Sequence, residues 1–147
     1  MIDVIIIGTG NVSFHFSKVI SNRNGLRLIG IYGRVRNIPD YFNKNISYSN
    51  DLKKIKYADI YIICVSDDAI GIVSDQLNVS EKSIVVHSSG STNISYLSKH
   101  KKHIACAMYV VSHHCSHYDA VKISRFLKLC KKYNIPTIVD AASEEYM

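Results

Sequence analysis

Short apolar runs recur along this chain, and each ends abruptly at glycine or at polar residues. The clearest runs are residues 4–7 (VIII), 26–32 (LRLIGIY), 58–65 (ADIYIICV) and 83–87 (SIVVH). Runs that are short, rich in β-branched residues and mostly apolar are typical of strands buried on both faces. Less regular patterns predict further strands at residues 46–48, 104–109 and 136–140.

Segments with helical spacing or helix-capping residues alternate with these runs. Helices are expected at residues 11–21, 51–56, 69–77 and 120–133. Asn50 is expected to cap the second helix, and Ser66 to cap the third, with Asp67 and Asp68 in its first turn. The two aspartates could also act as a catalytic pair, but capping explains them more simply.

Strands that alternate with helices predict the fold class. The order indicates an α/β protein with a doubly wound, mostly parallel sheet and helices on both faces. A length of 147 residues is enough to bury a core and suits one domain, residues 1–147.

The turn after the first strand has the pattern of a phosphate-binding turn. Residues 8–13 (GTGNVS) stand between a strand and a helix, which is the context that a GxGxx(small) motif requires. Gly8 and Gly10 turn the backbone tightly and leave no side chain where a pyrophosphate would approach the amides at the helix start. Ser13, where Gly or Ala is usual, is small enough for close packing. We expect a dinucleotide here, the alternative being a tight turn without a ligand.

Arginine follows the second strand, where NAD-selective folds place an acidic residue against the ribose hydroxyls. This chain has Arg34 and Arg36 instead. A guanidinium can pair with a 2′-phosphate through two hydrogen bonds, whereas a carboxylate would repel it. The sequence therefore favours NADP over NAD, the alternative being two exposed surface arginines.

Two further strand ends are expected to border the cofactor. Val65 and Ser66 lie at the end of the strand expected at residues 58–65, and in a doubly wound sheet this strand end lies beside the dinucleotide. Residues 88–91 (SSGS) could bind the nicotinamide side or a substrate oxygen, or form a plain serine-rich turn. His87 is a candidate acid or base, although a histidine at a strand end is more often structural. No catalytic residue is assigned.

Composition and charge limit the kinds of binding partner that the sequence predicts. The net charge is +6, but the lysines fall in pairs at helix ends or in loops, without a basic run interleaved with aromatics. We therefore expect solvated surface and no nucleic-acid partner. The four cysteines suggest free thiols rather than a disulfide framework, and no apolar stretch is long enough for a membrane span. A cytoplasmic location is expected.

Two other patterns carry less weight. His113, His114, Cys115 and His117 are zinc-ligand types, but they lack the spaced pairs of a structural zinc site, so no metal is expected. Tyr118 and Lys122 have the YxxxK spacing of short-chain dehydrogenases, but the glycine turn does not continue as that motif requires, which indicates coincidence.

Several motifs together resemble a known family. The stretches MIDVIIIGTGNVSFHF, IYGR, ADIYIICVSDDAI and IVVHSSGS resemble a bacterial family of NADP-type oxidoreductase-like proteins. In that family a Rossmann-like N-terminal domain precedes a helical C-terminal domain of unknown function. The first domain is similar to the cofactor domains of pyrroline-carboxylate reductases and hydroxyacid dehydrogenases. The resemblance covers residues 1–105 and implies a Rossmann-like fold.

The resemblance also implies a set of cofactor-binding residues. The phosphate turn would be formed by Gly8, Thr9, Gly10, Asn11 and Val12, with Arg34 at the 2′-phosphate, Val65 and Ser66 over the cofactor, and Ser89 with Gly90 near the reacting end.

The chain departs from this family after Tyr109. The sequence VVSHHCSH stands where the family has a Pro-Leu-Gln-like segment. The family's helical domain, which supplies most of the substrate pocket and the dimer contacts, would begin where this sequence stops. Two functions stay open: an NADP-dependent oxidoreductase domain that moves a hydride to or from a small carbonyl, imine or hydroxy compound, and a non-catalytic dinucleotide-binding or interaction module. The substrate is unidentified, and a homodimer is left open.

Overall fold

The computed structural model describes residues 1–105, which belong to the compact unit Met1–Met108. The described strands are β1 (Ile2–Ile7), β2 (Leu26–Tyr32), β3 (Tyr48–Ser49), β4 (Ile60–Ile63), β5 (Ile84–His87) and β6 (Lys102–Ala105). The described helices are α1 (Asn11–Ser21) and α2 (Ile70–Gln76), with 3₁₀ turns η1 (Leu52–Lys54), η2 (Asp67–Ala69) and η3 (Ile94–Leu97).

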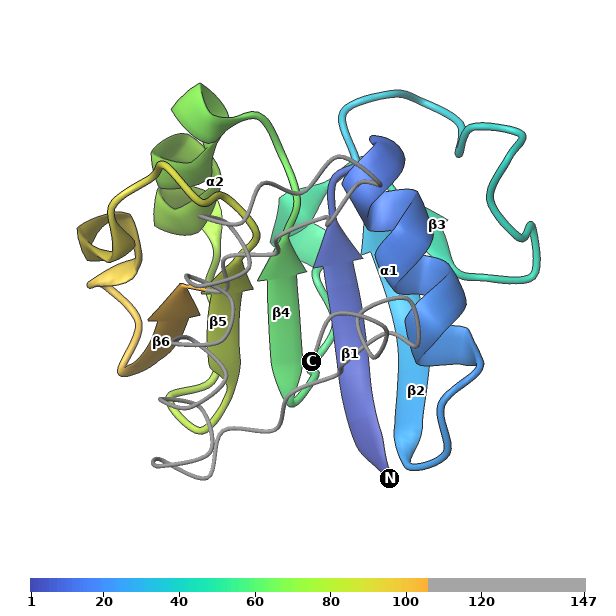
Figure 1. Ribbon diagram of the computed structural model, residues 1–147, viewed down its shortest axis with the longest axis horizontal. Helices are drawn as coiled ribbons and strands as arrows, with labels where there is room; N and C mark the ends of the chain where they lie inside the picture. Colours follow the sequence, from blue (N-terminus) through green and yellow to red (C-terminus); the bar gives the residue numbers. More distant parts are fainter. Residues whose placement is uncertain (106–147) are drawn as a thin grey trace, which may run out of the picture. The chain divides into compact units, whose positions relative to one another are not determined.

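The strands form one parallel sheet in the order β3-β2-β1-β4-β5-β6 (Figure 1). From β1 the chain moves outward through β2 to β3, then returns to the other side of β1 and moves outward again. This reversal makes the sheet doubly wound, as the alternation of strands and helices predicted. It also creates a switch point between β1 and β4, where open α/β sheets place their ligands.

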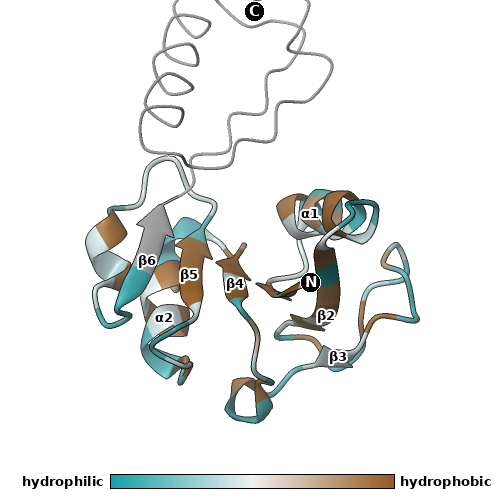
Figure 2. Ribbon diagram, turned by 90° about the horizontal axis from the view of Figure 1, so that it is seen from below, coloured by the Kyte–Doolittle hydropathy of each residue, from teal (hydrophilic) through white to brown (hydrophobic). Residues whose placement is uncertain are grey.

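Alternate residues of β1 enter two separate cores. Val4 and Ile6 face α1, whereas Ile5 and Ile7 face α2, and all four side chains are at most 3% exposed. Figure 2 shows α1 and α2 on opposite faces of the sheet. Burial on both faces explains why the strand reads as a continuous apolar run rather than an alternating one.

The central strands end at the same level. Ile7 pairs with Tyr32 of β2 and with Ile63 of β4, and Ile63 pairs in turn with His87 of β5. The loops that leave these strands therefore meet along one edge of the sheet.

Several expected boundaries and caps were wrong. The helix expected at residues 51–56 is only the single turn η1, and its N-terminus is capped by the side chain of Asp51, not of Asn50. Ser66 stands at the N-cap position of η2, but its side chain makes no capping hydrogen bond. The helix expected at residues 69–77 is present as α2, one residue shorter at each end, and the 3₁₀ turn η2 precedes it.

Strand ends also differ from the hydrophobic runs. The fourth strand is shorter than residues 58–65, and β6 begins at Lys102 because the pairing with β5 extends back to that residue. The weak third strand is Tyr48–Ser49 rather than residues 46–48, because Ile46 is not paired and packs against the α1-side core instead. The elements expected at residues 120–133 and 136–140 lie outside the described residues.

No helix within residues 1–105 is long and apolar enough to cross a membrane.

Candidate functional site

The turn between β1 and α1 lies at the switch point and depends on Gly8. This residue is buried and has a φ of +123°, a conformation that other residues rarely adopt. A Cβ atom at this position would lie 2.2 Å from the carbonyl oxygen of Cys64, the residue that follows β4. Glycine therefore allows the end of β1 to pass directly against the end of β4 before the chain enters α1.

Gly10 has a different role in the same turn. It occupies the N-cap position of α1 with φ −85° and ψ −172°, an extended conformation open to any residue. A Cβ atom there would meet nothing within 4 Å among the described residues. No side chain of residues 1–105 caps α1, and its first turn holds no acidic residue. The first turn of the helix thus carries backbone amides without a described side-chain cap, and a partial positive charge, which suits an anion.

Ser13 is the small residue under the turn. It is completely buried, and its hydroxyl lies 3.4 Å from the Cys64 carbonyl oxygen, to which it donates a hydrogen bond. The same hydroxyl would lie 3.1 Å from a Cβ on Gly8. A side chain larger than serine would push α1 away from the sheet, so the close packing expected at this position is present.

The end of β2 touches the glycine turn. A Cβ on Gly33 would lie 2.6 Å from Cγ2 of Thr9 and 2.7 Å from Oη of Tyr48. Arg34 and Arg36, which follow Gly33, are exposed, and neither forms an ion pair within the described part of the chain. Arg34 therefore directly follows Gly33, the residue after β2 that contacts the glycine turn.

The ends of β4 and β5 are joined by a polar contact. Ser91 donates a hydrogen bond of 2.5 Å to Asp67, and this hydroxyl is the main reason that the pKa of Asp67 is lowered. Ser89 accepts hydrogen bonds from the backbone N–H groups of Ser91 and Thr92. This is the geometry of a serine-rich turn, and it fixes residues 88–91 beside η2. Val65 packs partly into the α2-side core, while Ser66 is exposed.

His87 is enclosed beneath that loop. Its side chain is completely buried, and neither ring nitrogen has a hydrogen-bond partner among the described residues. Burial lowers the pKa of His87, while the nearby Asp67 carboxylate acts in the opposite direction. The imidazole is therefore neutral near pH 7 and lies at the same level of the sheet as Ile63 and Ile7.

The structure brings most of the expected site residues to one edge. The turn residues, Arg34, Val65, Ser66 and Ser89 all follow the carboxyl ends of β1, β2, β4 and β5. Sequence reasoning missed Tyr41, whose hydroxyl donates a hydrogen bond to the carbonyl oxygen of Thr9. The polar segment around it has no local signal that would have predicted this contact.

Some candidates cannot be placed in the same way. The cluster of His113, His114, Cys115 and His117 lies outside the described residues, as do Tyr118 and Lys122. Within residues 1–105 no group of three or more His, Cys, Asp or Glu side chains could hold a metal ion.

Comparison with solved structures gives matches at low sequence identity. A PanE/ApbA family ketopantoate reductase from Ralstonia eutropha JMP134 has a TM-score of 0.59 and 17% identity, covering 74% of this chain and 42% of its own. Prephenate dehydrogenase from A. aeolicus, in complex with hydroxyphenyl propionate and NAD⁺, has a TM-score of 0.59 and 18% identity, covering 95% and 59%. A conserved hypothetical protein from Sinorhizobium meliloti 1021 has a TM-score of 0.59 and 16% identity, covering 88% and 51%.

These likenesses confirm a Rossmann-like α/β fold, as the sequence predicted. The chain spans about half the length of the solved structures that it matches. No model of a known protein family matches it, and no protein of curated function does.

Proposed function

We propose that this domain binds NADP(H) at the carboxyl edge of its sheet, as part of an oxidoreductase that acts on a small carbonyl, imine or hydroxy compound. The observation that carries this proposal is the start of α1 at the switch point, which has no side-chain cap among the described residues and begins at Gly10, where a Cβ would meet no described atom within 4 Å. The NAD⁺ held by the similar prephenate dehydrogenase supports a nicotinamide dinucleotide.

Roles for the other residues follow from their positions. The amides of Asn11 and Val12 would bind the pyrophosphate, and Val65 and Ser66 would lie over the dinucleotide on the β4 side. Ser89 would border the nicotinamide end, two strands from the turn. The cofactor itself would supply the hydride chemistry, and the protein would bind and orient it.

The choice of NADP over NAD rests on Arg34. It is exposed, has no acidic partner within residues 1–105, and follows the Gly33 that contacts Thr9. An arginine at this end of β2 can pair with a 2′-phosphate, and residues 33–38, which follow β2, include no carboxylate for the ribose hydroxyls of NAD.

Replacement of Arg34 by aspartate tests this assignment. We expect Arg34→Asp to weaken NADPH binding about 10- to 100-fold, because it removes a charge-assisted contact and adds repulsion. NADH binding should change much less. The measurement is a calorimetric titration of the chain with each nucleotide.

Arg23→Asp is the matched control, because Arg23 is an exposed arginine in the turn before β2, at the opposite edge of the sheet. It makes the same change in net charge and should leave both affinities nearly unchanged. Absence of binding by either nucleotide to the unaltered chain would refute the cofactor assignment. Equal affinities for NADPH and NADH would remove the role of Arg34.

A non-catalytic dinucleotide-binding module is the second candidate. Within the described residues, the reacting edge offers Asp67, which is held in its charged form by Ser91, and His87, which is enclosed. Neither is placed as an exposed proton donor near neutral pH, which favours binding without catalysis. Oxidation of NADPH by the chain in the presence of 2-oxo acids or cyclic imines would show that it is an oxidoreductase and not a non-catalytic binding module.

A further inference from the structure

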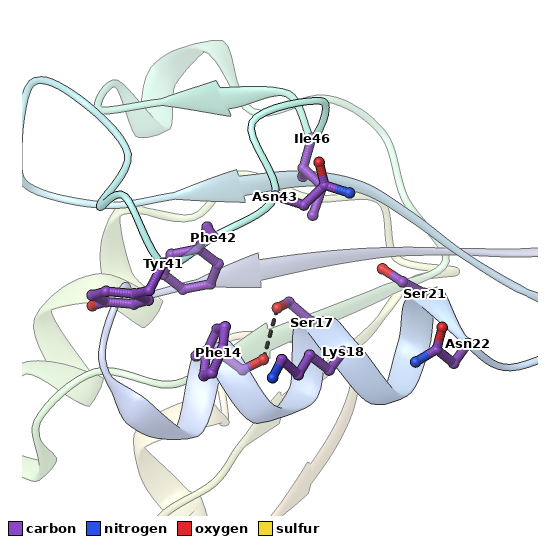
Figure 3. Close-up of a pocket in the computed structure, with 9 residues that line it drawn as sticks. All are labelled: Phe14, Ser17, Lys18, Ser21, Asn22, Tyr41, Phe42, Asn43 and Ile46. Atoms are coloured by element: carbon purple, nitrogen blue, oxygen red, sulfur yellow. Dashed lines mark hydrogen bonds between the residues drawn. The ribbon is translucent and has the colours of Figure 1, made fainter.

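A groove runs along α1 on the side that faces the segment between β2 and β3. It has a volume of about 370 Å³. Figure 3 shows its two walls, one from α1 and one from the β2–β3 segment. The lining residues are Phe14, Ser17, Lys18, Ser21, Asn22, Tyr41, Phe42, Asn43 and Ile46.

The groove exists because the β2–β3 connection has no helix. Parallel strands are usually joined by a helix that packs on the sheet beside its neighbour. Here residues 33–47 form an irregular segment, and Ile38, Phe42 and Ile46 are its contributions to the α1-side core. The space that a helix would fill next to α1 is therefore only partly covered.

One end of the groove is aromatic. The ring of Phe14 meets Tyr41 and Phe42 edge-on, with centroid separations of 5.5 and 5.8 Å. Phe42 is almost completely buried, whereas Tyr41 is 52% exposed. The buried ring of Phe42 and the exposed ring of Tyr41 lie side by side. Together they offer an apolar surface to a further planar group, because aromatic rings favour edge-on and offset contacts.

The groove also holds a cation. The ammonium group of Lys18 lies 4.4 Å from the centroid of the Phe14 ring, and no carboxylate pairs with it within residues 1–105. Lys44, on the β2–β3 segment but outside the groove lining, is paired with Asp40. The charge beside the aromatic surface is thus positive and available to an anion.

The geometry points to a second ligand site in this groove, for a small planar aromatic carboxylate. Its ring would pack against Phe14 and Tyr41, and its carboxylate would pair with Lys18. Charge complementarity selects this class over a neutral aromatic compound, because the lysine gains its only carboxylate partner among the described residues when the ligand binds.

Tyr41 connects this site to the glycine turn. Its ring forms the exposed wall of the groove, and its hydroxyl donates a hydrogen bond to the carbonyl oxygen of Thr9. A ligand that packs on the ring holds Tyr41 in place and so holds the turn. If the proposed function is right, groove ligand and NADPH each tighten the binding of the other, because such coupling is reciprocal.

The first experiment needs no nucleotide. Benzoate is titrated into the full chain while backbone amide resonances are followed by NMR, with benzamide as the neutral probe of the same shape. We expect benzoate to shift amides of α1 and residues 41–46 with a dissociation constant on the order of 1 mM. Lys18→Gln should weaken binding about fivefold, whereas Lys44→Gln, with the same loss of charge, should not.

Three outcomes would overturn the ligand assignment. These are equal binding of benzamide and benzoate, shifts confined to other segments, and an unchanged affinity in Lys18→Gln. Shifts of the same amides on raising the protein concentration alone would instead identify a second copy of this chain as the occupant.

The second experiment tests the coupling through Tyr41→Phe, which keeps the ring and removes the hydroxyl. Saturating benzoate should tighten NADPH binding about fivefold in the unaltered chain and have no effect in the variant. The same effect in both proteins would overturn the coupling. If NADPH does not bind at all, the proposed function is wrong. The benzoate titration then still tests, independently, whether the groove binds an aromatic carboxylate.

Discussion

Gly8→Ala is expected to lower the free energy of unfolding by about 3–5 kcal/mol. Two effects add at this position. The backbone has a φ of +123°, which is strained for any residue with a Cβ. The added methyl would also lie 2.2 Å from the Cys64 carbonyl oxygen, so β1 and β4 would have to separate. Urea unfolding followed by circular dichroism measures the change.

Gly10→Ala is the matched substitution for Gly8→Ala. The added methyl meets no described atom within 4 Å, and the backbone is already extended, so stability should change by no more than about 1 kcal/mol. NADPH binding should weaken about tenfold or more, because the methyl occupies the approach of the phosphate to the α1 amides.

Together the two variants separate the fold from the site. A Gly8→Ala protein as stable as the unaltered chain would show that β1 and β4 do not approach as described. A Gly10→Ala protein that binds NADPH normally would show that the phosphates do not lie over this turn.

The second large effect concerns pH. Burial lowers the pKa of His87 below its ordinary value of 6.5, so the folded protein keeps the imidazole neutral where the unfolded chain binds a proton. The unfolded state is therefore favoured as pH falls below about 6.5, by at most about 1.4 kcal/mol per pH unit for this one proton. Stability should decline from that pH downward until the folded pKa is reached.

Asp67 acts in a different pH range. Its pKa is lowered from 3.8, mainly by the Ser91 hydroxyl, so its contribution to stability is present above that value and is lost as pH falls through the lower folded pKa. Losses between about pH 6.5 and 5 therefore report on histidine rather than on this carboxylate.

His87→Leu tests the histidine assignment. It replaces two ring nitrogens that have no hydrogen-bond partner among residues 1–105 by apolar atoms, so stability at pH 7 should rise by about 1–2 kcal/mol. The decline in stability below about pH 6.5 should become shallower, because one protonating group is removed. Asp67→Asn should instead make the protein less stable at acid pH, because loss of the carboxylate lowers the pKa of His87 further. Denaturant unfolding at a series of pH values measures both. A large loss of stability in His87→Leu at pH 7 would contradict the absence of a partner.

Much of the fold follows from local pattern. Residues 11–21 and 26–32 were predicted as a helix and a strand and are α1 and β2 with the same bounds. The turn at Gly8 was predicted because a glycine that ends a β-branched run and precedes a helix leaves few alternatives. These predictions succeed because chain conformation and the burial of one short run decide them.

The errors arise where a contact with a distant residue decides. One error is local instead: Asp51, not Asn50, caps η1, because its side chain accepts a hydrogen bond from the backbone N–H of Lys53. Ser66 does not cap η2, and Asp67 instead accepts a hydrogen bond from Ser91, 24 residues further along the chain. Lys102 belongs to β6 only because it pairs with Ile84.

The features of the candidate site also divide into those that the sequence indicated and those that only the structure showed. The sequence indicated the residues at the strand ends, since each follows an apolar run. It could not indicate that Tyr41 contacts Thr9, that His87 lies close to Asp67 without a hydrogen bond, or that the groove beside α1 combines aromatic rings with Lys18. Each of these depends on how an irregular segment returns to the sheet.

By itself, the sequence determined the parallel α/β class, the glycine turn and the arginines after the second strand, because these depend on residue type, spacing and burial along a short stretch. Only the tertiary structure distinguished the two glycines. Gly8 is required because the carbonyl group of Cys64, 56 residues further along and directly after β4, lies against it, whereas a Cβ on Gly10 would meet no described atom within 4 Å. The local motif contains both glycines alike, and the difference lies in the atoms that the fold places, or does not place, beside each one.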